Sequence, residues 1–164
     1  GRATCWFLEH AMDDYGIIFC VDPFEGSMEH ADLDLSELYN RFKENTNYAQ
    51  KDNQRVVVKR NTSYNALATM VYQGERPFDF IYIDGDHRAE TVLEDLVLSF
   101  HLIDVGGVIL CDDCISWKHQ DKDKRYNLQS SPKLAVDNFI QCNWDKVEVL
   151  TLNNGYQTAF RRIK

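Results

Sequence analysis

The amino-acid sequence predicts an α/β protein with a doubly wound, mostly parallel β-sheet. Short apolar runs typical of buried strands alternate with segments whose apolar residues recur every three or four positions, as in helices. The strand runs are apolar throughout, which is typical of parallel strands covered on both faces. Near the end of the chain, Asn-Asn-Gly at residues 153–155 predicts a hairpin, which adds an antiparallel C-terminal end to the sheet.

The length and the net charge of the chain limit the number of domains and the kinds of partner that it can have. With 164 residues, 44% of them apolar, residues 1–164 are expected to form a single domain. A net charge of −8 leaves no basic surface for nucleic acid. No apolar run reaches the roughly 18 residues of a membrane span, and the start of the chain has no signal-peptide pattern. We therefore expect a soluble, cytoplasmic protein without nucleic-acid or membrane partners.

The first half of the chain is predicted to hold three helices and two strands. The helices are residues 1–12, a segment carrying Leu33, Leu38, Tyr39 and Phe42, and a segment from the capping residues Asn61, Thr62 and Ser63 to Gly74. The strands are the apolar runs at residues 17–21 and 55–59. The polar residues 44–54 are expected to form a loop.

The second half is predicted to hold two helices and four strands. The strands are residues 78–83, 108–111, 147–152 and 156–163. Apolar residues at helical spacing predict an amphipathic helix over residues 88–104, with Ala89, Val92, Leu93, Leu96, Phe100 and Ile103 on its inner face. Ser131 and Pro132 begin a last helix, whose candidate buried residues are Leu134, Ala135, Phe139 and Ile140. The polar residues 115–130 are expected to form a loop or lid.

The cysteines are predicted to pack in the core rather than to react. Cys20 and Cys111 lie inside apolar runs, where a reduced thiol behaves as a small hydrophobic group. Cys111 and Cys114 form a C-x-x-C, but no second pair completes a zinc site. A zinc or redox role is therefore the less favoured interpretation.

Polar residues follow four predicted strands, where parallel α/β sheets bind their ligands. They are Asp22, Asn61, Asp84 with Asp86, and Asp112 with Asp113. Each alone fits a turn or a helix cap, but their joint recurrence favours a site. If Asp84, Asp112 and Asp113 end neighbouring strands, three carboxylates converge, and a divalent cation would relieve their repulsion. Oxygen ligands favour Mg²⁺ or Ca²⁺.

Two neighbours of Asp84 add to this hypothesis. Gly85 allows a sharp turn or a close approach of the backbone to a ligand. Histidine is the residue type that most readily exchanges protons near neutral pH, so His87 is a candidate base, although a solvent-facing residue at a helix start is an equally good interpretation.

Residues 78–114, "FDFIYIDGDHRAETVLEDLVLSFHLIDVGGVILCDDC", resemble the class I S-adenosylmethionine-dependent methyltransferases. Within that class they resemble the small, metal-dependent O-methyltransferases, which include antibiotic-tailoring enzymes and catechol O-methyltransferase. The resemblance covers residues 1 to about 114 and implies a Rossmann-like sheet. The family's first strand would precede Gly1, so this sheet is expected to lack its central strand. Either the chain is truncated or another segment or subunit fills the gap, which makes a homo-oligomer one alternative.

The resemblance implies S-adenosylmethionine as cofactor and assigns residues to it. Gly1 matches the last glycine of the cofactor loop, and Asp22, 21 residues later, matches the carboxylate that binds the ribose hydroxyls. Asn61, Thr62 and Ser63 match the segment at the adenine edge.

The resemblance also implies a divalent-metal site and the methionine end of the cofactor site. The implied metal ligands are Asp84, Asp112 and Asp113, and Asp84 with Gly85 borders the methionine end. Three residues after the first metal aspartate, catechol O-methyltransferase has a lysine base, whereas this chain has His87.

The expected reaction is metal-assisted O-methylation of a small-molecule hydroxyl, with His87 or Asp86 taking the proton. Sugar hydroxyls, catechol-like phenols and antibiotic intermediates are all compatible acceptors. A metal-dependent phosphohydrolase using Asp84 and Asp86 is one alternative, although the sequence has no recognisable phosphate-binding arrangement. A non-catalytic domain that binds a nucleotide or a partner is the other, and the missing strand favours it.

Overall fold

A computed structural model describes residues 1–26, 34–75, 77–114, 131–150, 152 and 155–164. The chain divides into two compact units, Gly1–Ala66 and Leu67–Lys164, and each is described here by itself. Strands and helices alternate, which confirms the α/β class, and the strands form one two-stranded and one four-stranded sheet. The prediction of a single domain stays a prediction. The predicted lid at 115–130, Leu33, and the first two residues of the predicted hairpin turn lie outside the described residues.

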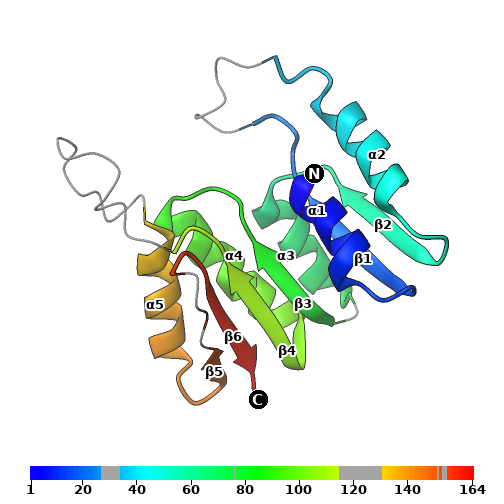
Figure 1. The fold of residues 1–164 in the computed structure, drawn as a ribbon. Coiled ribbons are helices and arrows are strands. Elements are labelled where there is room, and N and C mark those ends of the chain that lie inside the picture. The colour runs from blue at the N-terminus through cyan, green and yellow to red at the C-terminus, as the bar shows by residue number, and fades with distance from the viewer. Residues whose placement is uncertain (27–33, 76, 115–130, 151, 153–154) are drawn as a thin grey trace. The chain divides into compact units, whose positions relative to one another are not determined.

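The first unit is built on two parallel strands, β1 (Gly16–Val21) and β2 (Gln54–Lys59), with Val21 aligned to Lys59 (Figure 1). Before them, α1 (Arg2–Trp6) and the π-helix η1 (Phe7–Ala11) together form the predicted first helix. Its residue Leu8 is fully buried. The two strands are short, and a pair of this size needs a helix packed beside it to be stable.

The second predicted helix of this unit is longer than the sequence prediction. Helix α2 (Leu38–Ala49) continues through residues 44–49, which were wrongly predicted as a loop. Phe42, Thr46 and Ala49 are buried one turn apart along it, and the Thr46 hydroxyl donates a hydrogen bond to the Phe42 carbonyl at 2.9 Å. The residues between them are mostly polar and exposed. Because the buried face of α2 includes only one large apolar side chain, its helical periodicity is hard to recognise in the sequence.

Helix α3 (Ser63–Gln73) begins and ends as its capping residues predict. The backbone N–H of Asn65 donates to Thr62 Oγ1 at 3.4 Å, which is N-cap geometry. Gly74 follows the helix with φ of +64°, the left-handed conformation that ends helices.

The second unit is built on a four-stranded sheet in the order β3-β4-β6-β5. Its strands are β3 (Phe78–Ile83), β4 (Ile103–Cys111), β5 (Val147–Leu150) and β6 (Thr158–Arg162). Strands β3 and β4 are parallel, and β6 is antiparallel to both β4 and β5, which confirms the predicted antiparallel end. Strand β4 begins at Ile103 rather than Val108, because the chain pairs with β3 as soon as the preceding helix ends.

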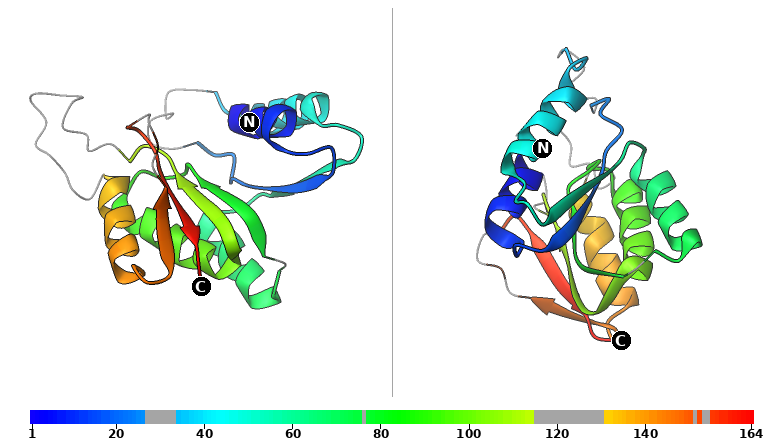
Figure 2. Two further views of the ribbon diagram at one scale, coloured as in Figure 1. Left: turned by 60° about the horizontal axis from the view of Figure 1, so that its bottom comes forward. Right: turned by 90° about the vertical axis from the view of Figure 1, so that its right-hand side faces the viewer.

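Two helices, α4 (Ala89–Leu102) and α5 (Pro132–Cys142), lie side by side on one face of this sheet (Figures 1 and 2). Helix α5 has the predicted Ser131 N-cap followed by proline. Leu93 and Leu134 were predicted to be buried, but they are 40% and 37% exposed, because each lies at the margin of its helix's apolar stripe. Among the described residues, no helix has the length and apolar content needed to cross a membrane.

The core of the second unit lies between these helices and the sheet. Ile83 of β3 and Ile109 and Cys111 of β4 point into it, and Phe160 of β6 is fully buried there. Because side chains alternate along a strand, Tyr82 of β3 and Leu110 of β4 face the other way. This alternation decides where the acids beyond the two strands lie.

Candidate functional site

The register of β3 and β4 brings two predicted metal ligands to the same strand ends. Ile83 aligns with Cys111, so Asp84 and Asp112 are the next residues of two neighbouring parallel strands. Both follow the even-numbered alternation, away from the buried face. The premise that these acids end neighbouring strands is therefore confirmed.

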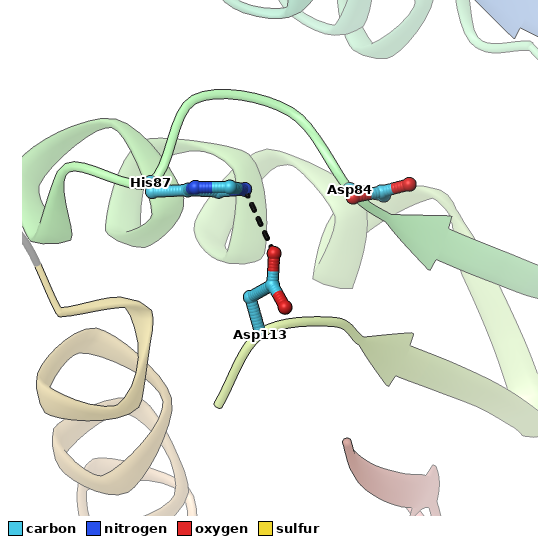
Figure 3. Close-up of side chains that lie close together, drawn as sticks. All are labelled: Asp84, His87 and Asp113. Carbon is cyan, nitrogen blue, oxygen red and sulfur yellow. Dashed lines mark ion pairs between the residues drawn. The ribbon is translucent and has the colours of Figure 1, made fainter. Parts of the chain in front are cut away.

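Asp113 joins the site through an unusual backbone conformation. Its φ of +49° is left-handed, a region that aspartate tolerates better than most non-glycine residues. Its Oδ2 lies 3.1 Å from Nε2 of His87, with which it forms an ion pair when the imidazole is protonated. The ligand atoms of Asp84, His87 and Asp113 all lie within 4.8 Å of one another. Figure 3 shows the three side chains and the ion pair between His87 and Asp113. The site thus draws on two strand ends and the loop after β3.

Asp112 lies beside this cluster rather than in it. Its Oδ2 accepts a hydrogen bond from the Tyr82 hydroxyl, and its Oδ1 accepts one from the Asp113 backbone N–H at 3.0 Å. The three groups gathered by the structure are therefore not the predicted trio, because His87 stands where Asp112 was expected. The sequence reasoning missed Tyr82, although its position two residues before Asp84 puts both on one face of the strand.

The electrostatics of the site are those of crowded carboxylates. Partial desolvation raises the pKa of Asp84, and the charge of Asp112 raises it further, while the Tyr82 hydroxyl acts to lower it. The Asp84 side chain still reaches solvent. Desolvation and the hydrogen bond to Asp112 also raise the pKa of Tyr82, so its phenol stays protonated and acts as a donor. Such crowding of like charges is a setting in which a cation binds favourably.

Asp86 has a different set of contacts from its neighbours in the loop. It accepts hydrogen bonds from the backbone N–H and Nε of Arg88 at 3.2 and 2.7 Å, and from the Thr91 hydroxyl at 3.2 Å. Partial burial acts to raise its pKa, but the bonds from Arg88 outweigh this and lower the pKa below the usual value. These contacts hold Asp86 at the start of α4 and make it a weaker base.

A small cavity of about 10 Å³ lies beneath the loop after β3. It is lined by residues 84–87 together with Ile83, Val92, Cys111, Asp112 and Pro132. A cavity of this size is near the minimum for one water molecule. Asp84, His87 and Asp112 therefore border a cavity with room for little more than a water molecule.

Asp95 is a second residue that the sequence reasoning missed. It is only 4% exposed, and its Oδ2 lies 3.8 Å from the position that a Cβ atom on Gly85 would occupy. A buried carboxylate thus lies under the loop that carries Asp84 and His87. The signal was present in the sequence, because Asp95 falls on the buried face of α4 between Val92 and Leu96.

The cysteines of the C-x-x-C segment are packed. Cys111 and Cys114 are 1% and 5% exposed, and both are free thiols. Burial raises the pKa of each thiol, which keeps the reactive thiolate scarce. Their environment is that of core residues.

In the first unit, the residues predicted to bind cofactor follow the ends of β1 and β2. Oδ1 of Asp22 accepts a hydrogen bond from the Phe24 backbone N–H at 2.6 Å, and the side chain is exposed. Oδ1 of Asn61 accepts one from the Thr62 N–H at 2.9 Å. Val21 and Lys59 are paired, so Asp22 and Asn61 end neighbouring strands.

Gly1 and Ser63 complete the predicted cofactor residues of this unit. Gly1 is the N-cap of α1, and a Cβ atom there would lie 2.9 Å from the ring of Phe42. The close approach of α2 therefore explains structurally why a residue without a side chain occupies position 1. Ser63 is the first residue of α3.

The donor set of the second unit fits a divalent cation. Two carboxylates and one imidazole converge, and a third carboxylate lies next to them. Carboxylate oxygens suit Mg²⁺, Ca²⁺ and Mn²⁺, and imidazole is compatible with Mn²⁺ and other transition ions. Asp84, Asp113 and Asp112 are the groups that would hold such an ion.

Parallel strands with polar groups at their carboxyl ends are typical of α/β proteins that bind ligands. The carboxylates and the imidazole gathered here are groups that can exchange protons or coordinate a cation. The methyltransferase domain family matches residues 1–114, and the chain belongs to that family. This confirms the predicted family and class of enzyme, a methyltransferase. No curated protein sequence matches the chain.

Solved structures of similar fold include O-methyltransferases. TomG from Streptomyces achromogenes, solved with S-adenosylmethionine, has 17% identity and a TM-score of 0.60, with 100% of this chain and 69% of TomG covered. MycE of mycinamycin biosynthesis, solved with Mg and S-adenosylhomocysteine, has 12% identity and a TM-score of 0.52, with 98% of this chain and 48% of MycE covered. At these identities the likeness concerns the fold.

Proposed function

We propose that this methyltransferase transfers a methyl group from S-adenosylmethionine to a hydroxyl of a small molecule, assisted by a divalent cation. The observation that carries the proposal is the convergence of Asp84, His87 and Asp113, with Asp112 beside them. The similar folds of TomG, solved with S-adenosylmethionine, and MycE, solved with Mg, support it.

In the second unit, different residues would bind the cation and accept the proton of the acceptor hydroxyl. When bound, the cation lowers the pKa of the acceptor hydroxyl, and the cofactor supplies an activated methyl group. Asp84, Asp113 and Asp112 would hold the cation. His87 would take the acceptor proton at Nδ1, while its Nε2 lies 3.1 Å from Asp113 Oδ2, whose negative charge stabilises the protonated ring. Asp86, whose pKa Arg88 lowers, is the less suitable acceptor.

The residues that match the family's cofactor-binding positions would bind S-adenosylmethionine. Asp22 accepts hydrogen bonds from the ribose hydroxyls, since its side chain is exposed and one of its oxygens is not used by Phe24. Gly1 lies at the cofactor loop, and residues 61–63 at the adenine edge. Asp84 and Gly85 border the methionine end.

The acceptor would be a small molecule in the cytoplasm rather than a nucleic acid. The net charge of −8 supports this choice, because a polyanion would be repelled. A homo-oligomer stays a prediction.

Thermal unfolding with and without Mg²⁺ or Ca²⁺, at matched ionic strength, tests the cation. We expect either ion to raise the melting temperature of the natural protein. Asp112→Asn should stabilise the cation-free form, because it removes one of the repelling charges, and should reduce the gain on adding the ion. Asparagine keeps an acceptor for the Tyr82 hydroxyl, so the change is limited to the charge.

Three outcomes would contradict parts of this proposal. No cation-specific gain in the natural protein would remove the metal. Equal gains in both proteins would remove Asp112 from the ligands. Binding of S-adenosylhomocysteine with no transfer of labelled methyl to phenols or sugar hydroxyls would favour the non-catalytic nucleotide-binding alternative.

A further inference from the structure

Tyr82 makes a long-range side-chain contact at the carboxyl ends of β3 and β4. It belongs to β3, and its hydroxyl donates a hydrogen bond to Oδ2 of Asp112, 30 residues later, beyond the end of β4. Asp84 is the first residue after β3, so the phenol that bonds to Asp112 comes from the strand that Asp84 follows.

The position of Tyr82 explains this reach. Tyr82 lies one residue before the end of β3, and Asp84 is the first residue after it. If the alternation of the strand continues by one residue, the two side chains leave the same face about 7 Å apart. A tyrosine lying along the strand brings its hydroxyl to the strand end, whereas serine or threonine at this position is too short. The hydroxyl is therefore the part of Tyr82 that reaches Asp112.

The negative charges of Asp84 and Asp112 suggest a role for the hydrogen bond between Tyr82 and Asp112. Asp84 and Asp112 repel each other, and this repulsion tends to push the two carboxylates apart when no cation is bound. The Tyr82 hydroxyl, a neutral donor bonded to Asp112, offsets part of that repulsion and fixes the direction of the Asp112 carboxylate. Hydrogen bonds that orient the ligands of a metal in this way strengthen its binding, and their loss typically costs 10- to 100-fold in affinity.

We propose that Tyr82 is a positioning residue of the cation site, whose hydroxyl holds the Asp112 carboxylate beside Asp84 before the cation binds. This inference rests on the proposed function, because the cation is the one that would assist methyl transfer. Tyr82 itself contacts neither cation nor substrate in this role, and acts through Asp112.

The test is Mn²⁺ binding to the full chain, measured by electron paramagnetic resonance of the free ion and by calorimetry. We expect Tyr82→Phe, which keeps the ring and removes the hydroxyl, to weaken Mn²⁺ binding about tenfold. Tyr72→Phe is the matched control, since Tyr72 is 91% exposed on α3, and its affinity should equal that of the natural protein. Far-ultraviolet circular dichroism checks that each variant is folded.

A double-mutant cycle separates positioning from a general structural effect. In an Asp112→Ala background, Tyr82→Phe should have little further effect on Mn²⁺ affinity, because the hydroxyl has lost the group through which it acts. Equal affinities of Tyr82→Phe and the natural protein would overturn the inference and leave the proposed function standing. A full tenfold loss in the Asp112→Ala background would also overturn it. If the natural protein does not bind Mn²⁺, the cation-assisted function fails and the inference fails with it.

Discussion

The turn after β1 and the turn after β4 each contain a non-glycine residue in the left-handed conformation, but the two residues have different roles. Phe24 and Asp113 are the two non-glycine residues with positive φ in the described part of the chain, at +59° and +49°. After β1 the left-handed residue is a phenylalanine only 6% exposed, whose ring centre lies 5.0 Å from those of Tyr39 and Phe42. After β4 it is a carboxylate that faces His87. The turn after β1 therefore contributes to the core through Phe24, whereas the turn after β4 places the Asp113 carboxylate next to His87.

The partners of the acids differ in the same way. Asp22 accepts from the backbone two residues later, which is a local turn contact. Asp112 and Asp113 instead meet Tyr82 and His87, which come from another strand end. An acid after a strand is by itself a turn residue. It becomes part of a chemical site where side chains from separate strands crowd together.

The two turns also differ in what offsets their strain. A left-handed conformation costs roughly 1–2 kcal/mol for most residues, and aspartate tolerates it better than a bulky side chain does. Phe24 therefore depends on the burial of its ring, whereas Asp113 depends little on packing. Substitutions at the two turns should separate a stability role from a chemical one.

The largest expected effect is on stability, at Phe24. Phe24→Ala should lower the free energy of unfolding by about 3–5 kcal/mol, because a buried ring is lost. Phe24→Gly should lose about 1 kcal/mol less, because glycine adopts positive φ without strain. Urea unfolding of both variants measures the difference. A glycine variant less stable than the alanine variant would show that the backbone strain at this turn is negligible.

Next in size is an effect on catalysis, at Asp84. Asp84→Asn should lower kcat/KM for methyl transfer at least about 100-fold, roughly 2.7 kcal/mol, because a ligand charge is lost from the cation site. Asp79→Asn, an exposed acid on the same strand, is the control and should keep full activity. Comparable rates for the two variants would reduce the strand-end acids of the second unit to turn residues.

The smallest effect is on cofactor affinity, at Asp22. Asp22→Ala should weaken S-adenosylhomocysteine binding by roughly 1–3 kcal/mol, because a charged acceptor is lost. Asp22→Asn keeps an acceptor for the Phe24 N–H and loses only the charge, so it separates the turn from the ligand contact. Calorimetry gives both affinities. Unchanged affinity in the alanine variant would leave Asp22 as a purely local turn residue.

The local features of the fold could be predicted from the sequence. Apolar runs and helical spacing placed the strands and most helices, and Ser131, Pro132, Thr62 and Gly74 marked helix ends. These signals are local, because capping and periodicity depend on residues a few positions apart. The missed half of α2 shows the limit, since its buried positions include Thr46 and Ala49, which carry little hydrophobic signal.

The sequence by itself determined which acids end neighbouring strands, because the order of elements in an α/β chain sets which strand ends meet. It could not determine which side chains would share a partner. That depended on the register of Ile83 with Cys111 and on the left-handed turn at Asp113. It depended as well on the Tyr82 hydroxyl, which holds Asp112, while His87 meets Asp113. Such contacts join residues about 26 to 30 positions apart, so only tertiary structure brings them into hydrogen-bonding distance.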